Sequence, residues 1–156
     1  MTTTFADYAA AAEARNDIAQ AVLGHTMALC EALRQNYIDY SIKSHQHAIG
    51  NNGIVDESYV PYHEECIAKL RQGICDYDYI IETGRKYHRI VMVIQHDNCK
   101  PSRSVHAFVD KKTGEVYKSA SWKSPAKGVR FDLRIIEQRK WLLEHADWAG
   151  SYLYKR

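Results

Sequence analysis

The sequence predicts an α+β fold, in which a small antiparallel β-sheet packs with a long N-terminal helix and a C-terminal helix. An Ala-rich stretch near the N-terminus carries apolar residues at helical spacing. The middle of the chain is rich in β-branched and aromatic residues between turn signals, and the last part returns to a helical pattern. With 156 residues, we expect a single domain over 1–156, comprising helical 1–40, sheet 77–120 and helical 124–146.

The N-terminal helix is predicted from Thr4 to about Tyr40. Thr4 followed by Asp7 resembles a capping box with Asp in place of Glu, and Gly24 is a candidate break between two helices. An apolar stripe follows this helix at Ile18, Val22, Leu29, Leu33 and Tyr37. Two interpretations remain open: the stripe packs on the chain's own sheet, or it forms a seam with a second subunit.

Residues 41–61 contain Asn-Asn-Gly and a proline, which predicts a loop. A short helix is expected over 62–72, ending at Gly73. This region also holds His45, His47, His63 and Cys66. No accompanying pattern supports a metal site, so adventitious histidines are favoured and we predict no bound metal. The four cysteines form no C-x-x-C pair, and we expect free thiols.

The sheet is predicted as a meander of three or four antiparallel strands. Its expected parts are a strand from Tyr77 with a turn at Thr83-Gly84, a central strand at Tyr87–Gln95, a strand at Val105–Val109, a turn at Asp110–Gly114 and a partner strand at Glu115–Lys118. Gly114 is expected to supply a positive φ. After the sheet, Ser124-Pro125 resembles the start of a single helical turn ended by Gly128, and Asp132 is expected to cap a helix that continues to about His145.

Charge is distributed unevenly along the chain. Residues 1–84 hold 5 Lys/Arg against 12 Asp/Glu, whereas residues 85–140 hold 14 against 5. Such asymmetry indicates either an anionic partner for the second part or mutual neutralisation of the two halves across the fold, and these two interpretations stand equal. No nucleophile, P-loop or dinucleotide motif is found, so we predict no catalytic residues and no cofactor. No apolar run long enough to span a membrane and no signal-peptide pattern is found, so we expect a cytoplasmic protein.

A basic segment follows the predicted hairpin. Arg130 and Arg134 stand four residues apart, so in a helix they would share one face and form a fork for phosphate oxygens. Aromatic side chains nearby could stack on a base. The candidate ligand-binding residues are Arg103, Phe108, Lys118, Trp122, Lys123, Lys127, Arg130 and Arg134. The alternative is that the aromatic residues belong to the core and the lysines form a solvated rim.

The stretch SVHAFVDKKTGEVYKSASWKSPAKGVR resembles a signature shared by small tailed-phage proteins, and within that group it is similar to the first-described type of Thoeris anti-defence sponge proteins. That resemblance implies an antiparallel sheet with helices in a non-enzymatic oligomer. It also implies sequestration of cyclic ADP-ribose isomers or cyclic trinucleotides. The paired arginines of that family match Arg130 and Arg134, and its base-stacking aromatic residue matches Phe108. The Ala-rich helix and the Asn-Asn-Gly loop lie outside the signature.

We therefore expect a phage-type counter-defence protein in the cytoplasm of an infected bacterial host. It would be a homo-oligomer that binds and sequesters a phosphorylated nucleotide signal, a cyclic ADP-ribose isomer or a cyclic oligonucleotide, without cleaving it. One alternative is a phage protein that binds nucleic acid. Another is a protein inhibitor of a host defence enzyme that uses the acidic first half of the chain.

Overall fold

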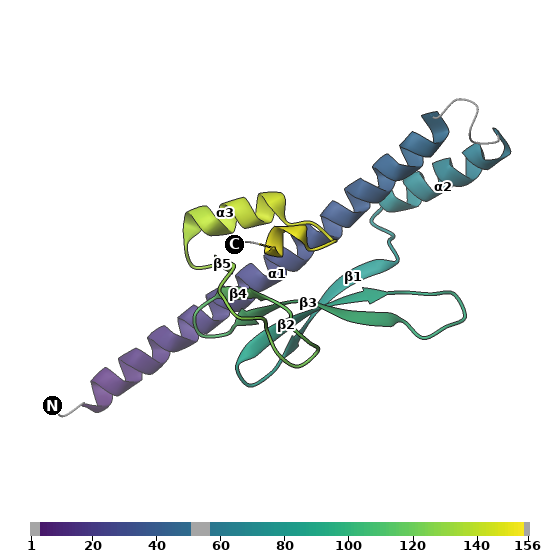
Figure 1. Ribbon diagram of the computed structural model, residues 1–156. Coiled ribbons are helices and arrows are strands. Elements are labelled where there is room, and N and C mark those ends of the chain that lie inside the picture. Colours follow the sequence, from purple (N-terminus) through teal and green to yellow (C-terminus); the bar gives the residue numbers. More distant parts are fainter. Residues whose placement is uncertain (1–3, 51–56, 155–156) are drawn as a thin grey trace.

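The computed structural model describes residues 4–50 and 57–154, and it confirms the α+β fold with a long N-terminal helix, an antiparallel sheet and a C-terminal helix. The elements are α1 (Phe5–Gly50), a 3-10 turn (Glu57–Tyr59), α2 (Val60–Arg71), β1 (Tyr77–Thr83), β2 (Tyr87–Ile94), β3 (Ser102–Asp110), β4 (Glu115–Lys118), β5 (Phe131–Asp132), α3 (Ile136–His145) and a 3-10 turn (Ser151–Leu153). Figure 1 shows α1 as the long axis, with α2 against its C-terminal part and its N-terminal part extending past the sheet.

Helix α1 begins as predicted but is longer than expected. The backbone N–H of Asp7 donates to Thr4 Oγ1 over 3.1 Å, which confirms the N-cap. The helix passes through Gly24 without a break and continues to Gly50, so the expected loop is wrong for residues 41–50. Half-buried residues recur there at helical spacing because α2 packs against this end. The remainder of the predicted loop up to residue 56 lies outside the described residues.

The apolar stripe of α1 packs on the chain's own sheet. Val22, Leu29 and Leu33 are fully buried in one cluster with the β2 residue Ile90 and the β3 residue Val109. Burial of such side chains stabilises the fold by about 1.5–3 kcal/mol each. The stripe is therefore the intramolecular contact, and its central residues are not available to a second subunit.

The sheet has five antiparallel strands in the order β1-β2-β3-β4-β5, one more than the predicted maximum. The extra strand, β5, has two residues and pairs Glu115 with Asp132 and Val116 with Phe131. Such a short strand has no period-2 pattern to detect. Gly114 has φ +77° and closes the β3–β4 turn as expected, because its left-handed conformation is readily adopted by glycine.

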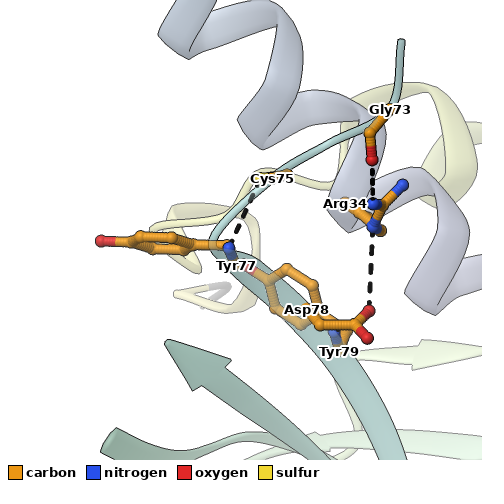
Figure 2. A network of polar contacts seen from close by, with 6 residues as sticks. All are labelled: Arg34, Gly73, Cys75, Tyr77, Asp78 and Tyr79. Carbon is orange, nitrogen blue, oxygen red and sulfur yellow. Dashed lines mark hydrogen bonds and ion pairs between the residues drawn. The ribbon is translucent and has the colours of Figure 1, made fainter. Parts of the chain in front are cut away.

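Strand β1, at one edge of the sheet, is fastened to α1 through Arg34 (Figure 2). The guanidinium of Arg34 donates to the carbonyl oxygen of Gly73 over 2.5 Å and lies 3.8 Å from Asp78 Oδ1. The same carboxylate oxygen accepts the backbone N–H of Tyr79 over 2.9 Å, and the N–H of Tyr77 meets the Cys75 thiol at 3.4 Å. Two donors on the free edge are thus satisfied within the chain, which blocks strand addition at this end of β1.

The segment between β4 and α3 differs from the prediction. Ser124 and Pro125 do not start a helical turn, because Pro125 forms an isolated antiparallel bridge with Ser119. Asp132 belongs to β5 rather than to a helix N-terminus, although its carboxylate accepts the N–H of Arg134 over 2.9 Å. The helix itself starts at Ile136, later than expected, and ends at His145, as expected.

All four cysteines are free, as predicted. Of the helices that the structure describes, none is both long enough and apolar enough to cross a membrane.

Candidate anion-binding site

The sheet face opposite α1 carries a row of polar and aromatic side chains. Strand register places Glu82, Arg89, Phe108 and Tyr117 directly opposite one another across β1 to β4. Directly opposite residues of antiparallel strands project from the same face. The next row, which includes Ile90 and Ala107, belongs to the core on the α1 side. The Arg89 row therefore lies on the outer face.

Residues 119–130 fold over this outer face and cover part of it. The second half of the segment is hydrogen-bonded to β4, because Ala126 N–H donates to Lys118 O over 2.7 Å and Arg130 N–H donates to Val116 O over 2.7 Å. Near the start of the segment, Trp122 lies against the outer face of the sheet.

Trp122 contacts two guanidinium groups of the outer face. The Cζ atoms of Arg89 and Arg103 lie 5.1 Å and 5.4 Å from its ring centroid, within the range of cation–π attraction. Arg103 also forms an ion pair with Glu82. Arg103 belongs to β3, and its ion pair neutralises the charge of the Glu82 carboxylate.

A cavity of about 360 Å³ opens beside this arrangement, at the turn between β1 and β2. It is lined by Glu82, Thr83, Gly84, Arg85, Lys86, Tyr87, Arg89, Phe108 and Lys123. The lining thus holds four cationic side chains and one carboxylate, that of Glu82. This carboxylate already forms an ion pair with Arg103. The excess of positive charge makes the cavity suitable for an anion.

Arg89 is the central residue of this cavity. Its guanidinium lies 5.9 Å from the Phe108 ring centroid, on the side chain that forms the cavity floor. Its Nε atom is buried, and no residue that the structure describes accepts a hydrogen bond from it. A buried donor without a partner is costly, and the half-buried Arg89 side chain lines a cavity whose positive charge an anion would offset.

The structure separates the residues that the sequence grouped together. Lys123, Phe108, Trp122 and Arg103 lie at or beside the cavity. Phe108 is only 2% exposed, so it contributes the floor of the cavity and offers no open face.

Lys118 lies at a different place. Its Nζ atom is 4.4 Å from the ring centroid of Tyr154, in a crevice of about 200 Å³ that His106 also lines. That crevice is formed with the C-terminal segment, away from the β1–β2 turn.

The expectation that Arg130 and Arg134 share one helix face is wrong, since Arg130 precedes β5 and Arg134 lies in the turn before α3. The guanidinium of Arg130 donates to the carbonyl oxygens of Leu153, Lys127 and Gly128, over 2.7 Å, 3.2 Å and 2.9 Å. Arg130 is engaged in holding the segment and the C-terminus together. Arg134 and Lys127 are both exposed and lie outside the cavity lining.

Sequence reasoning missed seven of the nine lining residues, and four of the seven are basic or aromatic: Arg85, Lys86, Tyr87 and Arg89. Their signal was present as a basic and aromatic cluster, Gly-Arg-Lys-Tyr-His-Arg, directly after a predicted turn. A turn brings such residues to the rim of a sheet, but only the fold of residues 119–130 completes the cavity around them.

One histidine of the predicted loop, His45, pairs with His63 of α2. His45 Nδ1 lies 2.8 Å from His63 Nδ1, which joins α1 to α2, and burial lowers the pKa of His45. Within residues 4–50 and 57–154, no three His, Cys, Asp or Glu side chains converge in a way that could hold a metal ion.

Comparison with known proteins identifies the family of the chain but no individual relative. No curated protein and no solved structure matches the chain. A family model matches residues 5–155, nearly the whole sequence, and the chain therefore belongs to the family of unknown function DUF7717.

Proposed function

We propose that this protein binds and sequesters a phosphorylated nucleotide in the cavity at the β1–β2 turn. The observation that carries the proposal is the group of four cationic side chains that line the cavity, Arg85, Lys86, Arg89 and Lys123. Charge-assisted hydrogen bonds from guanidinium to phosphate are among the strong ones. The volume of about 360 Å³ is at the lower end of ligand pockets, which suits one nucleotide better than a strand.

The proposed binding site is built on regular secondary structure. Arg89 and Tyr87 belong to β2, which is hydrogen-bonded on both sides by β1 and β3. Lys111 Nζ donates to Gly84 O over 2.8 Å, and so fixes the β1–β2 turn to the β3–β4 turn. A preorganised site loses little freedom on binding, which favours tight capture over turnover.

The bound nucleotide is proposed to be released unchanged. Thr83 Oγ1 lies 2.9 Å from His88 Nδ1 at the cavity edge, a distance compatible with a nucleophile and base. However, these residues are directly opposite one another in the sheet, and the contact satisfies the buried His88 ring. Recovery of a hydrolysed ligand would contradict sequestration and would make Thr83 and His88 the first residues to replace.

The resemblance to anti-defence sponge proteins supplies the proposed ligands and setting. We propose a phage-type counter-defence protein that holds a cyclic ADP-ribose isomer or a cyclic oligonucleotide in the cytoplasm of an infected bacterium. The cavity, rather than the Arg130 and Arg134 pair, is the proposed binding site.

The test is calorimetric titration of purified protein with cyclic ADP-ribose isomers, a cyclic trinucleotide, mononucleotides and a short single strand. Arg89→Ala should weaken binding roughly 10- to 100-fold, since it removes charge-assisted hydrogen bonds of about 1.5–3 kcal/mol. Arg89→Lys should restore only part, because lysine lacks the forked donors. The matched control is Arg71→Ala, an exposed arginine on α2, at the other end of β1 from the cavity.

Two other outcomes would replace the proposal. Binding of the single strand alone, with affinity that falls steeply with salt, would identify a nucleic-acid-binding protein. Binding of none of these ligands, together with stoichiometric capture of one host defence enzyme, would identify a protein inhibitor.

We also propose a homo-oligomer. Apart from the half-buried Ala12, residues 5–17 of α1 are exposed, and Figure 1 shows this part beyond the sheet. Phe5 and Tyr8 are 85% and 61% exposed on it. Large exposed apolar side chains on a projecting helix are typical of a protein–protein contact.

A further inference from the structure

The aromatic rings around the cavity are already in contact with other side chains. The ring of Phe108 is buried and makes edge contacts with Tyr87, whose centroid is 5.8 Å away. Lys86 Nζ lies 5.3 Å from the Tyr87 centroid, and Tyr87 makes a further edge contact with Tyr117. Trp122 is 40% exposed, but it does not line the cavity. Stacking on a base needs an open ring face, and the cavity lining offers little of this kind.

Most polar side chains that line the cavity are hydrogen-bond donors. Arg85, Lys86, Arg89 and Lys123 are donors only, whereas base edges are distinguished by matched donors and acceptors. Two acceptors of the lining are occupied, because Glu82 is paired with Arg103 and Thr83 Oγ1 bonds to His88. The Tyr87 hydroxyl is the remaining side-chain acceptor of the lining. The side chains that remain available therefore sense negative charge and offer little to identify a base.

The four cations come from three separate parts of the chain. Arg85 and Lys86 belong to the β1–β2 turn, Arg89 to β2 and Lys123 to the segment over the sheet. They surround the cavity rather than forming one surface stripe. A single phosphate monoester carries only about −1.5 to −2 charges at neutral pH. Two linked phosphates match this ring of positive charge more closely.

From these contacts we infer that the cavity recognises a compact ligand through two or more linked phosphates and is indifferent to the base. This inference rests on the proposed function and defines its ligand class. It makes the protein a general trap for small diphosphate-bearing nucleotides, in which the nucleoside lies toward the cavity mouth.

The test is titration of the full chain at fixed ionic strength with inorganic pyrophosphate, ADP, CDP, AMP and adenosine. Pyrophosphate, ADP and CDP should bind with dissociation constants within roughly threefold of one another, at one ligand per chain. AMP should bind at least about tenfold more weakly, and adenosine should not bind. Arg89→Ala should weaken pyrophosphate, ADP and CDP by the same factor, and Arg71→Ala should weaken none.

The outcomes separate this inference from the proposed function. If one nucleotide binds more than about tenfold tighter than the others, or if nucleotides bind and pyrophosphate does not, the base is recognised and the inference is wrong while the proposed function stands. Equal binding of AMP and ADP would overturn the requirement for linked phosphates. If none of the five ligands, no cyclic ADP-ribose isomer and no cyclic trinucleotide binds, the proposed function fails together with the inference.

Discussion

Arg130 is held by three backbone carbonyl groups, and this arrangement determines what its replacement should do. Its guanidinium joins residues 127 and 128 to the carbonyl of Leu153 near the C-terminus. Arg130→Ala should reduce stability by about 1–3 kcal/mol, which lowers the melting temperature by roughly 3 to 10 °C for a chain of this size. Affinity for ligand should stay within about twofold. Thermal melts and ligand titrations on the same samples test this. An unchanged melting temperature together with a large loss of affinity would show that Arg130 contacts the ligand.

His106 should make the fold sensitive to mild acid. Its Nε2 lies 2.7 Å from the buried hydroxyl of Tyr152, and burial lowers the pKa of His106 to about 4, against a smaller opposing effect of Asp147. The unfolded chain binds a proton at this side chain near its ordinary value of about 6.5. Stability is therefore complete above about pH 6.5 and falls as the pH drops toward 4, by about 3 kcal/mol from this residue.

Chemical denaturation of wild type and His106→Gln at several pH values tests this effect. Glutamine does not titrate, so the stability of the variant should change less between pH 6.5 and 4 than that of wild type, even if it is lower throughout. Some slope should remain, because burial also lowers the pKa values of His25, His45 and His88. Identical slopes in the two proteins would show that His106 is not the titrating group.

At the scale of elements, Trp122 fastens residues 119–130 to the sheet. The ring contacts the guanidiniums of Arg89 and Arg103, and such contacts contribute about 0.5–1 kcal/mol each at partly exposed sites. Trp122→Ala should loosen the segment while the core stays folded. Trypsin should then cut faster after Lys123 and Lys127, with a small change in melting temperature, and Trp122→Phe should restore much of the protection. Unchanged cleavage in Trp122→Ala would show that the backbone contacts to β4 suffice.

The elements that the sequence predicted correctly are those with local signals. The Thr4 cap, the positive φ of Gly114 and the end of α3 at His145 each depend on a few neighbouring residues. The C-terminal part of α1 was missed because packing against α2, a tertiary contact, overrides the weak helical propensity there. The helical turn expected at Pro125 fails because pairing with Ser119 selects an extended backbone instead.

The site was predicted only in part, for a related reason. The position of basic residues after the hairpin was visible in the sequence, and Lys123 and Arg103 do lie at or beside the cavity. Arg89 was not distinguishable from any other strand arginine. Its role depends on strand register, on the fold of residues 119–130 and on a missing acceptor for Nε, and none of these is a property of neighbouring residues in the sequence.

The molecule as a whole divides into an acidic, mainly helical part and a basic part that contains the proposed cavity. Residues 1–84, a range that includes α1, α2 and β1, hold 12 Asp/Glu against 5 Lys/Arg. The cavity is instead built mainly from residues after Thr83. An anionic ligand is therefore drawn toward the β1–β2 turn and away from the helices. This separation leaves the projecting part of α1 free to make a different contact.

That contact is the proposed homo-oligomer interface. The apolar stripe from Val22 to Leu33 is occupied by the sheet, so the available surface is the N-terminal part of α1 with Phe5 and Tyr8. A helical extension of this length is marginally stable in water without tertiary packing. Association with a second copy would bury its exposed rings and stabilise it.

Light scattering at micromolar concentration should therefore show a dimer or larger species for wild type. The double variant Phe5→Ser with Tyr8→Ser should shift the population toward monomer, while Arg89 and the other cavity residues remain in place and ligand affinity per chain changes little. The matched control is Tyr59→Ser, which replaces an equally exposed ring, 59% exposed, at the start of α2. A wild-type protein that is entirely monomeric under these conditions would contradict the oligomer. A double variant that stays oligomeric would place the interface elsewhere.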